Sequence, residues 1–132
     1  MDLSAAYNAA HYRVFADPPF VLRVGERSAE LNALLASHSA GTWAFITACN
    51  PGSVPLSDEE NAERMVRLRE MLNHLTTYPG EGIDPTDEWP GEPSVLVVGI
   101  DRAEAVEVAK TFEQAAILAG IRGGAAELVW IV

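Results

Sequence analysis

Amide, carboxyl and hydroxyl side chains lie near the expected ends of strands and helices between residues 50 and 114. These groups bind polar ligands or move protons, and they are Asn50, Asn61, Glu92, Ser94 and Gln114. Asn50 follows the apolar run 43–49, which predicts a buried strand. Ligands commonly bind beyond the carboxyl ends of strands in sheets that carry helices. We therefore expect a polar site at the loop that begins with Asn50.

Two classes of function are compatible with such a site. In the first, the protein is a non-catalytic binding module for an unidentified small ligand or protein. In the second, it is a small hydrolase or transferase in which Glu92 acts as general acid or base, while the amides of Asn50, Asn61 and Gln114 position the substrate. The enzyme needs Glu92 in a dry pocket with a raised pKa. The sequence shows no recognisable nucleophile with a neighbouring base, which favours the binding module.

Each of these residues also has a purely structural alternative. Asn50 precedes a Pro-Gly pair, where an asparagine amide often bonds to local backbone in a turn. Asn61 and Glu92 could satisfy buried groups or anchor a loop, because buried polar groups generally have hydrogen-bond partners. Gln114 could pair with a carbonyl left free at the end of a helix. The sequence alone leaves both interpretations open.

We expect no metal and no other cofactor. The segment 81–92 contains five acids and no base, but their spacing does not match a calcium loop, so a solvated acidic loop is favoured. Three acids at residues 58–60 occupy the start of the helix after Asn50 and would repel a phosphate from it. Cys49 is expected to be a small hydrophobic residue of the strand. The three histidines lack the spacing of a zinc site.

Charge and composition limit the partners and the location. The chain of 132 residues has a formal net charge of −10, and its nine Lys and Arg residues are scattered or expected on an exposed helix face at Arg64, Arg67 and Arg69. Nucleic acid and membrane surfaces are disfavoured partners, because both are bound mainly through clustered basic side chains. One cysteine, no secretory leader pattern and no run of roughly 20 apolar residues favour a cytoplasmic protein.

Hydrophobic periodicity predicts helices over residues 2–10, 28–37, 57–76 and 101–113, and strands over 11–15, 20–24, 43–49, 94–100, 116–119 and 127–132. The segment 78–93 is rich in Pro, Gly and acid and predicts a loop with at most a short strand. Hairpins at both ends of the chain argue against a doubly wound parallel sheet. We expect a single domain over residues 1–132, an α+β sandwich in which about three helices pack on a mixed, largely antiparallel sheet.

The helix that begins near residue 57 has the clearest register. Ser57 and Glu60 form a capping-box pattern, and Met65 begins an apolar stripe that continues with leucines at 68, 72 and 75. Asn61 lies one turn before Met65, where the stripe predicts an apolar side chain. An amide at this position either has a structural partner or serves a ligand.

The last strand, residues 128–132, is apolar and terminal. Unpaired edges of this kind pair readily with another chain. A homo-oligomer formed through the C-terminal strand is therefore a further expectation.

Five short segments suggest a family: ITACNP at 46–51, EN at 60–61, GEG at 80–82, WPGEPS at 89–94 and FEQAA at 112–116. Their order and approximate spacing resemble an uncharacterised bacterial family, domain of unknown function 3293. The chain departs from this pattern at Cys49, where the family has a large aromatic residue, and at Ala115, where an asparagine often follows the glutamine. The resemblance implies a small stand-alone cytosolic bacterial protein without an assigned activity.

Overall fold

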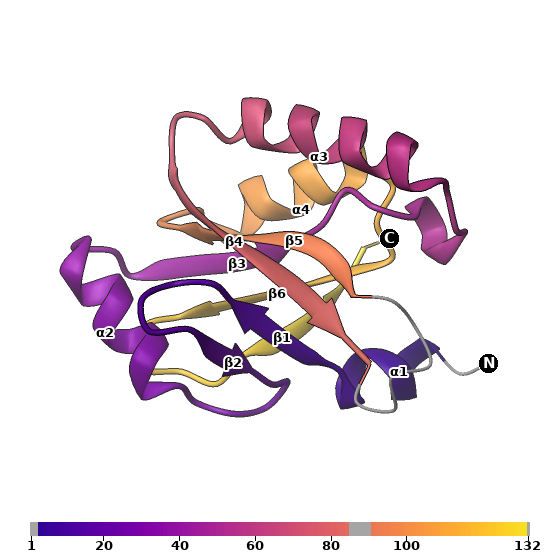
Figure 1. The fold of residues 1–132 in the computed structure, drawn as a ribbon. Helices are drawn as coiled ribbons and strands as arrows, with labels where there is room; N and C mark the ends of the chain where they lie inside the picture. The colour runs from indigo at the N-terminus through magenta and orange to yellow at the C-terminus, as the bar shows by residue number, and fades with distance from the viewer. Residues whose placement is uncertain (1–2, 85–90, 132) are drawn as a thin grey trace.

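A seven-stranded antiparallel sheet organises the chain in the computed structural model, which describes residues 3–84 and 91–131 (Figure 1). The elements in chain order are α1 (Leu3–Ala9), β1 (His11–Val14), β2 (Phe20–Leu22), α2 (Ala29–Ser37), β3 (Thr42–Ile46), the 3-10 turn η1 (Pro51–Ser53), α3 (Asp58–Met71), β4 (Thr76–Ile83), β5 (Glu92–Val98), α4 (Arg102–Thr111), β6 (Ala116–Ile121) and β7 (Glu127–Trp130). The strands lie in the order β2-β1-β4-β5-β3-β6-β7, and every neighbouring pair is antiparallel. This arrangement confirms the predicted α+β fold.

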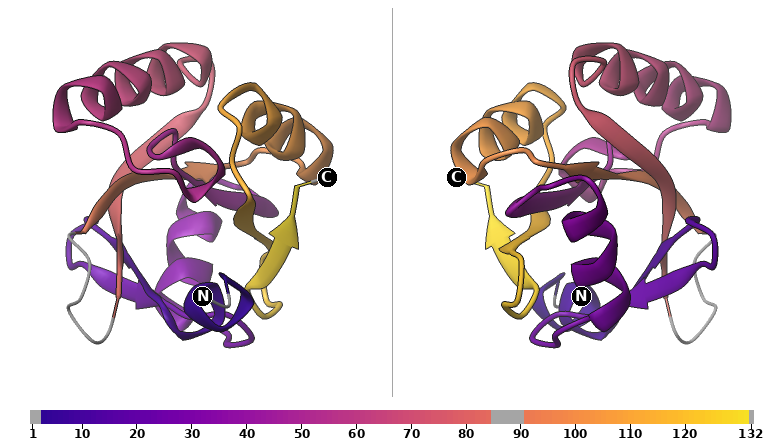
Figure 2. Two further views of the ribbon diagram at one scale, coloured as in Figure 1. Left: turned by 90° about the vertical axis from the view of Figure 1, so that its right-hand side faces the viewer. Right: turned by 90° about the vertical axis from the view of Figure 1, so that its left-hand side faces the viewer.

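The sheet is curled, and helices lie on both of its faces. Figure 2 shows α3 and α4 on the outer face, whereas α2 lies in the hollow that the sheet partly encloses. At one end the two sides of the hollow meet, because Gly25 N donates to Ala126 O at 2.8 Å and Ala126 N donates to Glu26 O at 3.0 Å. The short helix α1 lies toward the opposite end of the sheet from α2 (Figure 1).

Alternation along β3 divides the core into two parts. Trp43 and Phe45 point into the hollow and pack with the side chains of α2, whereas Ala44 and Ile46 pack under α3 and α4. All four side chains are buried. A polar residue that follows Phe45 in the same alternation must therefore lie at the end of the hollow, and that residue is Thr47.

The capping box of α3 is present as predicted, and Leu68 and Leu72 are fully buried. The helix ends at Met71 rather than near residue 76, because Asn73 and His74 are weak helix formers and the chain turns there. The stripe nevertheless continues through the turn, since Leu75 packs against the outer core.

The prediction of a loop for residues 78–93 is wrong for its first part. β4 is one of the longer strands and pairs with β1 on one side and β5 on the other. Its sequence hides the strand because Pro79 and two glycines interrupt any alternation. Pro79 still contributes an acceptor, taking a hydrogen bond from Phe15 N at 2.9 Å. Residues 85–90 of the expected acidic loop, which include Asp87 and Glu88, lie outside the described residues.

The other elements lie close to their predicted places, with shifted ends. β3 ends at Ile46 rather than Cys49, and β5 begins at Glu92. Asp101 caps α4 by accepting from Glu104 N, but the Glu104 side chain bonds to His74 instead of closing a second capping box. β7 is an edge of the sheet, so a homo-oligomer formed there stays a prediction. Within the described ranges, no helix has the length and apolar character needed to cross a membrane.

Gly80 allows β4 to approach its neighbours closely. A Cβ at this position would lie 2.7 Å from Arg13 O and 2.7 Å from the Phe45 ring. We expect Gly80→Ala to lower the free energy of unfolding by about 1–3 kcal/mol through overpacking, as measured by urea denaturation. Gly82→Ala is the matched control, because a Cβ there meets nothing within 4 Å. Equal effects of the two substitutions would contradict this account.

Candidate functional site

The residue that links the predicted site is Asn50, in the loop after β3. Its Nδ2 donates to Glu92 Oε2 at 2.9 Å, which joins the loop to the first residue of β5. Its backbone N donates to Asn61 Oδ1 at 3.0 Å, and its Oδ1 accepts from Asn61 Nδ2 at 2.8 Å. Oδ1 also accepts from Leu56 N at 3.0 Å. One asparagine thus connects β5, the start of α3 and the segment that leads from η1 into α3.

The backbone of Asn50 has φ 48° and ψ 67°, in the left-handed region. Asparagine tolerates this region better than most residues other than glycine. The conformation ends the β3 direction and turns the chain toward η1. The observed contacts of Asn50 and Asn61 therefore agree with the structural alternative for these amides, and a ligand role stays a prediction.

Gln114 joins the same region from the end of α4. It is buried, and its Nε2 donates to Cys49 O at 3.0 Å and Phe112 O at 3.1 Å. The second bond is the predicted pairing with a carbonyl at a helix end. The preceding residue, Glu113, has φ 57°, and its carbonyl accepts from Gly52 N at 2.7 Å. The end of α4 is therefore hydrogen-bonded to the loop that contains Asn50.

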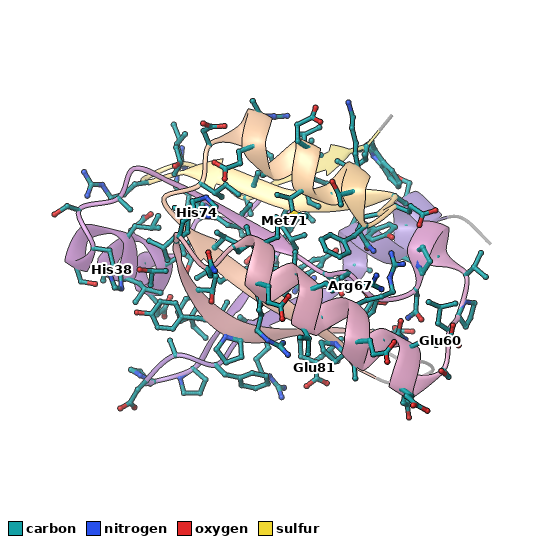
Figure 3. All side chains as sticks on the ribbon, turned by 90° about the horizontal axis from the view of Figure 1, so that it is seen from above. His38, Glu60, Arg67, Met71, His74 and Glu81 are labelled. Atoms are coloured by element: carbon teal, nitrogen blue, oxygen red, sulfur yellow. The ribbon has the colours of Figure 1, made fainter. Side chains whose placement is uncertain are left out.

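The expectation that Arg64 lies on the exposed face of α3 is wrong. Its side chain is 15% exposed, and its guanidinium donates to Ala48 O and to Phe112 O, each at 2.5 Å. Arg67 and Arg69 are exposed as expected, and Arg67 lies on the outer side of α3 (Figure 3). The helical period contains the missing signal, because Arg64 is three residues after Asn61 and four before the buried Leu68.

A partly enclosed cavity of about 40 Å³ lies beside these contacts, and Tyr7 of α1 belongs to its lining. Its polar lining residues are Tyr7, Tyr12, Thr47, Glu92, Ser94 and Gln114, and apolar side chains such as Phe45 and Leu118 complete it. Three of the five predicted site residues therefore line one cavity. The other two are Asn50, which is hydrogen-bonded to Glu92, and Asn61, which is hydrogen-bonded to Asn50.

The helix α1 supplies one wall of this cavity through Tyr7. The hydroxyl of Tyr12 donates to Tyr7 O at 2.7 Å, and the Tyr7 hydroxyl is hydrogen-bonded to Ser53 Oγ at 3.2 Å. The Tyr7 ring also meets Trp130 edge-on, with centroids 5.5 Å apart. These contacts join α1 to β1, η1 and β7.

Sequence reasoning missed Thr47, Tyr7 and Tyr12 as lining residues. Tyr12 and Thr47 follow from strand alternation with Val14 and Phe45, respectively. Tyr7 carries no local signal, because its partners are far away in the sequence.

Burial is the main electrostatic feature of the site. It raises the pKa of the Glu92 carboxyl above its ordinary value, and the hydrogen bond from Asn50 partly opposes this rise. It raises the pKa of Tyr12 as well, so that this hydroxyl keeps its proton. Burial also raises the pKa of the Cys49 thiol, which agrees with the expectation of an unactivated, hydrophobic cysteine.

Comparison with known proteins identifies a family but no activity. The family model described as "Protein of unknown function (DUF3293)" matches residues 46–117, just over half of the chain. The matched segment contains all five predicted site residues, whereas Tyr7 and Tyr12 precede it. This match confirms the resemblance noted from the sequence. Neither the curated proteins nor the solved structures contain a match to the chain.

Asn61→Leu tests whether the hydrogen bonds between Asn61 and Asn50 stabilise the fold. The substitution leaves Asn50 N without its partner and removes one of the two hydrogen bonds to Asn50 Oδ1, so we expect it to lower the free energy of unfolding by about 1–3 kcal/mol in urea denaturation. Ala62→Leu, at an exposed neighbouring position of α3, is the control and should be nearly neutral. An unchanged stability of Asn61→Leu would mean that the amide pair has no structural importance.

Glu92→Gln tests the cost of burying the carboxylate. Because folding raises the pKa of Glu92, its favourable contribution is present below the ordinary value of 4.5 and is lost as the pH rises through the folded-state pKa. Urea unfolding at a series of pH values should therefore show the original chain losing stability relative to Glu92→Gln from about pH 4.5 upward. Glu70→Gln, at an exposed site, should not change the pH dependence in this way. Parallel pH profiles for the original chain and Glu92→Gln would refute the assignment.

Proposed function

The chain belongs to the DUF3293 family, and we propose that it is a small cytosolic bacterial binding module that recognises a polar ligand at the cavity beside Glu92. The observation that carries this proposal is the position of Glu92 itself. Its side chain is half-buried at the wall of a cavity, and among the described residues its carboxyl has one hydrogen-bond partner, Asn50. Partial burial of a carboxyl with a single partner is costly, so its presence beside a cavity favours a functional role.

The arrangement around Glu92 supports binding because it is already formed. Asn50 fixes one carboxyl oxygen, and Asn61 fixes Asn50 from the first turn of α3. A carboxyl held in this way loses little freedom when a ligand binds, which favours affinity. The nearest basic side chain in this network, Arg64, is bonded to Ala48 O and Phe112 O rather than to Glu92.

A small ligand is the better partner for this site than nucleic acid or a membrane. The net charge of −10 opposes binding to phosphate backbones and to anionic lipid surfaces. The cavity also lies within the fold rather than on an open basic face. A protein partner stays an expectation based on the sequence.

The second candidate is the hydrolase or transferase with Glu92 as general acid or base. The raised pKa of Glu92 favours it, because a carboxyl that holds its proton more tightly than usual is better suited to act as a general acid. That mechanism also needs amides that hold the substrate. The amides of Asn50, Asn61 and Gln114 are hydrogen-bonded within the protein, so the geometry supports binding better than catalysis.

A fragment screen by two-dimensional amide NMR tests the proposal. The fragments are small polar cations, anions and neutral molecules, applied to the original chain, to Glu92→Gln and to Glu70→Gln. We expect at least one class to shift the backbone signals of cavity residues such as Ser94 and Gln114 in the original chain and in Glu70→Gln. The same shifts should be lost in Glu92→Gln, which keeps an acceptor for Asn50 Nδ2.

Two results of this screen would contradict the proposal. If no class of fragment shifts these signals, or if Glu92→Gln responds as the original chain does, the cavity beside Glu92 is not a binding site. Turnover of a fragment that depends on Glu92 would instead establish the catalytic candidate.

A further inference from the structure

The hydrogen bonds of the cavity show which chemical groups it leaves available. Thr47 Oγ1 donates to Pro93 O at 2.7 Å, and Ser94 Oγ donates to Glu92 O at 3.0 Å. A hydroxyl has one donor and two acceptor positions. Both hydroxyls have therefore used their only donor on backbone carbonyls. Thr47 Oγ1 also accepts from Cys49 N at 3.0 Å, so one acceptor position remains on Thr47 and two remain on Ser94.

Tyr12 and Gln114 follow the same pattern. The Tyr12 hydroxyl donates to Tyr7 O, so its oxygen is left as an acceptor. Gln114 uses Nε2 for two carbonyls, those of Cys49 and Phe112, which leaves the amide oxygen for other partners. The Glu92 carboxylate, when ionised, offers acceptors only. Five of the six polar side chains that line the cavity thus contribute acceptors and no free side-chain donor.

The charge of the lining also favours a ligand that carries hydrogen-bond donors. Among the residues that the structure describes, Glu92 is the only acid of the lining, and no Lys, Arg or His belongs to it. Three aromatic rings, those of Tyr7, Tyr12 and Phe45, form part of the wall. Aromatic faces attract cations, and a carboxylate in a low-dielectric site attracts them more strongly.

We propose that this cavity binds the primary ammonium group of a small amine, with Glu92 as its counter-ion. The inference rests on the proposed binding function and names its ligand class. An ammonium group has three donors and no acceptor, which complements a wall of acceptors. Anions are repelled by Glu92, and a ligand rich in acceptors finds no free side-chain donor on these five residues.

The size of the cavity limits the size of the group that it can hold. A volume of about 40 Å³ exceeds the minimum for a single water, roughly 10–15 Å³, only a few times. This space suits a compact head group rather than a whole metabolite. The remainder of a longer amine has to lie outside the cavity.

Titration with methylammonium chloride, followed by two-dimensional amide NMR, tests the ligand class. We expect saturable shifts of the Thr47, Ser94 and Gln114 signals in the original chain and in Glu70→Gln. Glu92→Gln should bind methylammonium about tenfold more weakly or worse, because it loses a charge-assisted hydrogen bond. Sodium chloride at equal concentration supplies a cation without N–H donors, and methanol supplies a similar size without charge. Neither should give saturable shifts at these residues.

The outcomes separate this inference from the proposed function. If neutral or anionic fragments bind in a Glu92-dependent manner and methylammonium does not, the ligand class is wrong and the binding function stands. If sodium produces the same shifts as methylammonium, the cavity binds cations without using N–H donors, and the proposed ammonium site is wrong. If no fragment of any class binds, both proposals fail together.

Discussion

The hydrogen bonds of Asn50 are the constraint on which the site depends. Its backbone N and its side chain make four hydrogen bonds, to Asn61, Leu56 and Glu92. No regular element could connect these three positions, because they belong to a helix, a loop and a strand entry. Asn50 has a left-handed backbone and a short amide side chain. The amide accepts a hydrogen bond from Leu56 N in the loop and also donates one to the Glu92 carboxyl.

A second set of contacts occupies the guanidinium of Arg64. It donates to two carbonyls, and the one at Phe112 lies at the C-terminal end of α4, where the helix dipole is negative. Gln114 also donates to this carbonyl. The basic group thus stabilises the packing of α3 against α4 and the end of β3.

The sequence predicts the fold class and the α3 register. It also singles out Glu92, Ser94 and Gln114, which line one cavity, but it does not predict how these side chains are arranged. Polar residues such as Asn61 stand out because they interrupt an apolar stripe. The position of Glu92 beside a cavity does not follow from any local pattern, since the wall includes Tyr7, whose hydroxyl partner Ser53 is 46 positions away. β4 forms despite the weak strand propensity of Pro79 and its glycines, because it pairs with a strand on each side. Arg64 is only 15% exposed despite its charge, because its place in the helical period lies beside the buried stripe of α3.

The half-buried Glu92 carboxyl also has a consequence for the lifetime of the protein. A ligand that binds only the folded chain raises the free energy of unfolding, by an amount that grows with the logarithm of the ratio of ligand concentration to dissociation constant. The chain without ligand carries the desolvation cost of Glu92, which a cation bound as proposed above would offset. Cellular proteases remove chains mainly from the unfolded population. A chain with this cavity would therefore be degraded faster when its ligand is scarce, so that its abundance follows the supply of the molecule it binds.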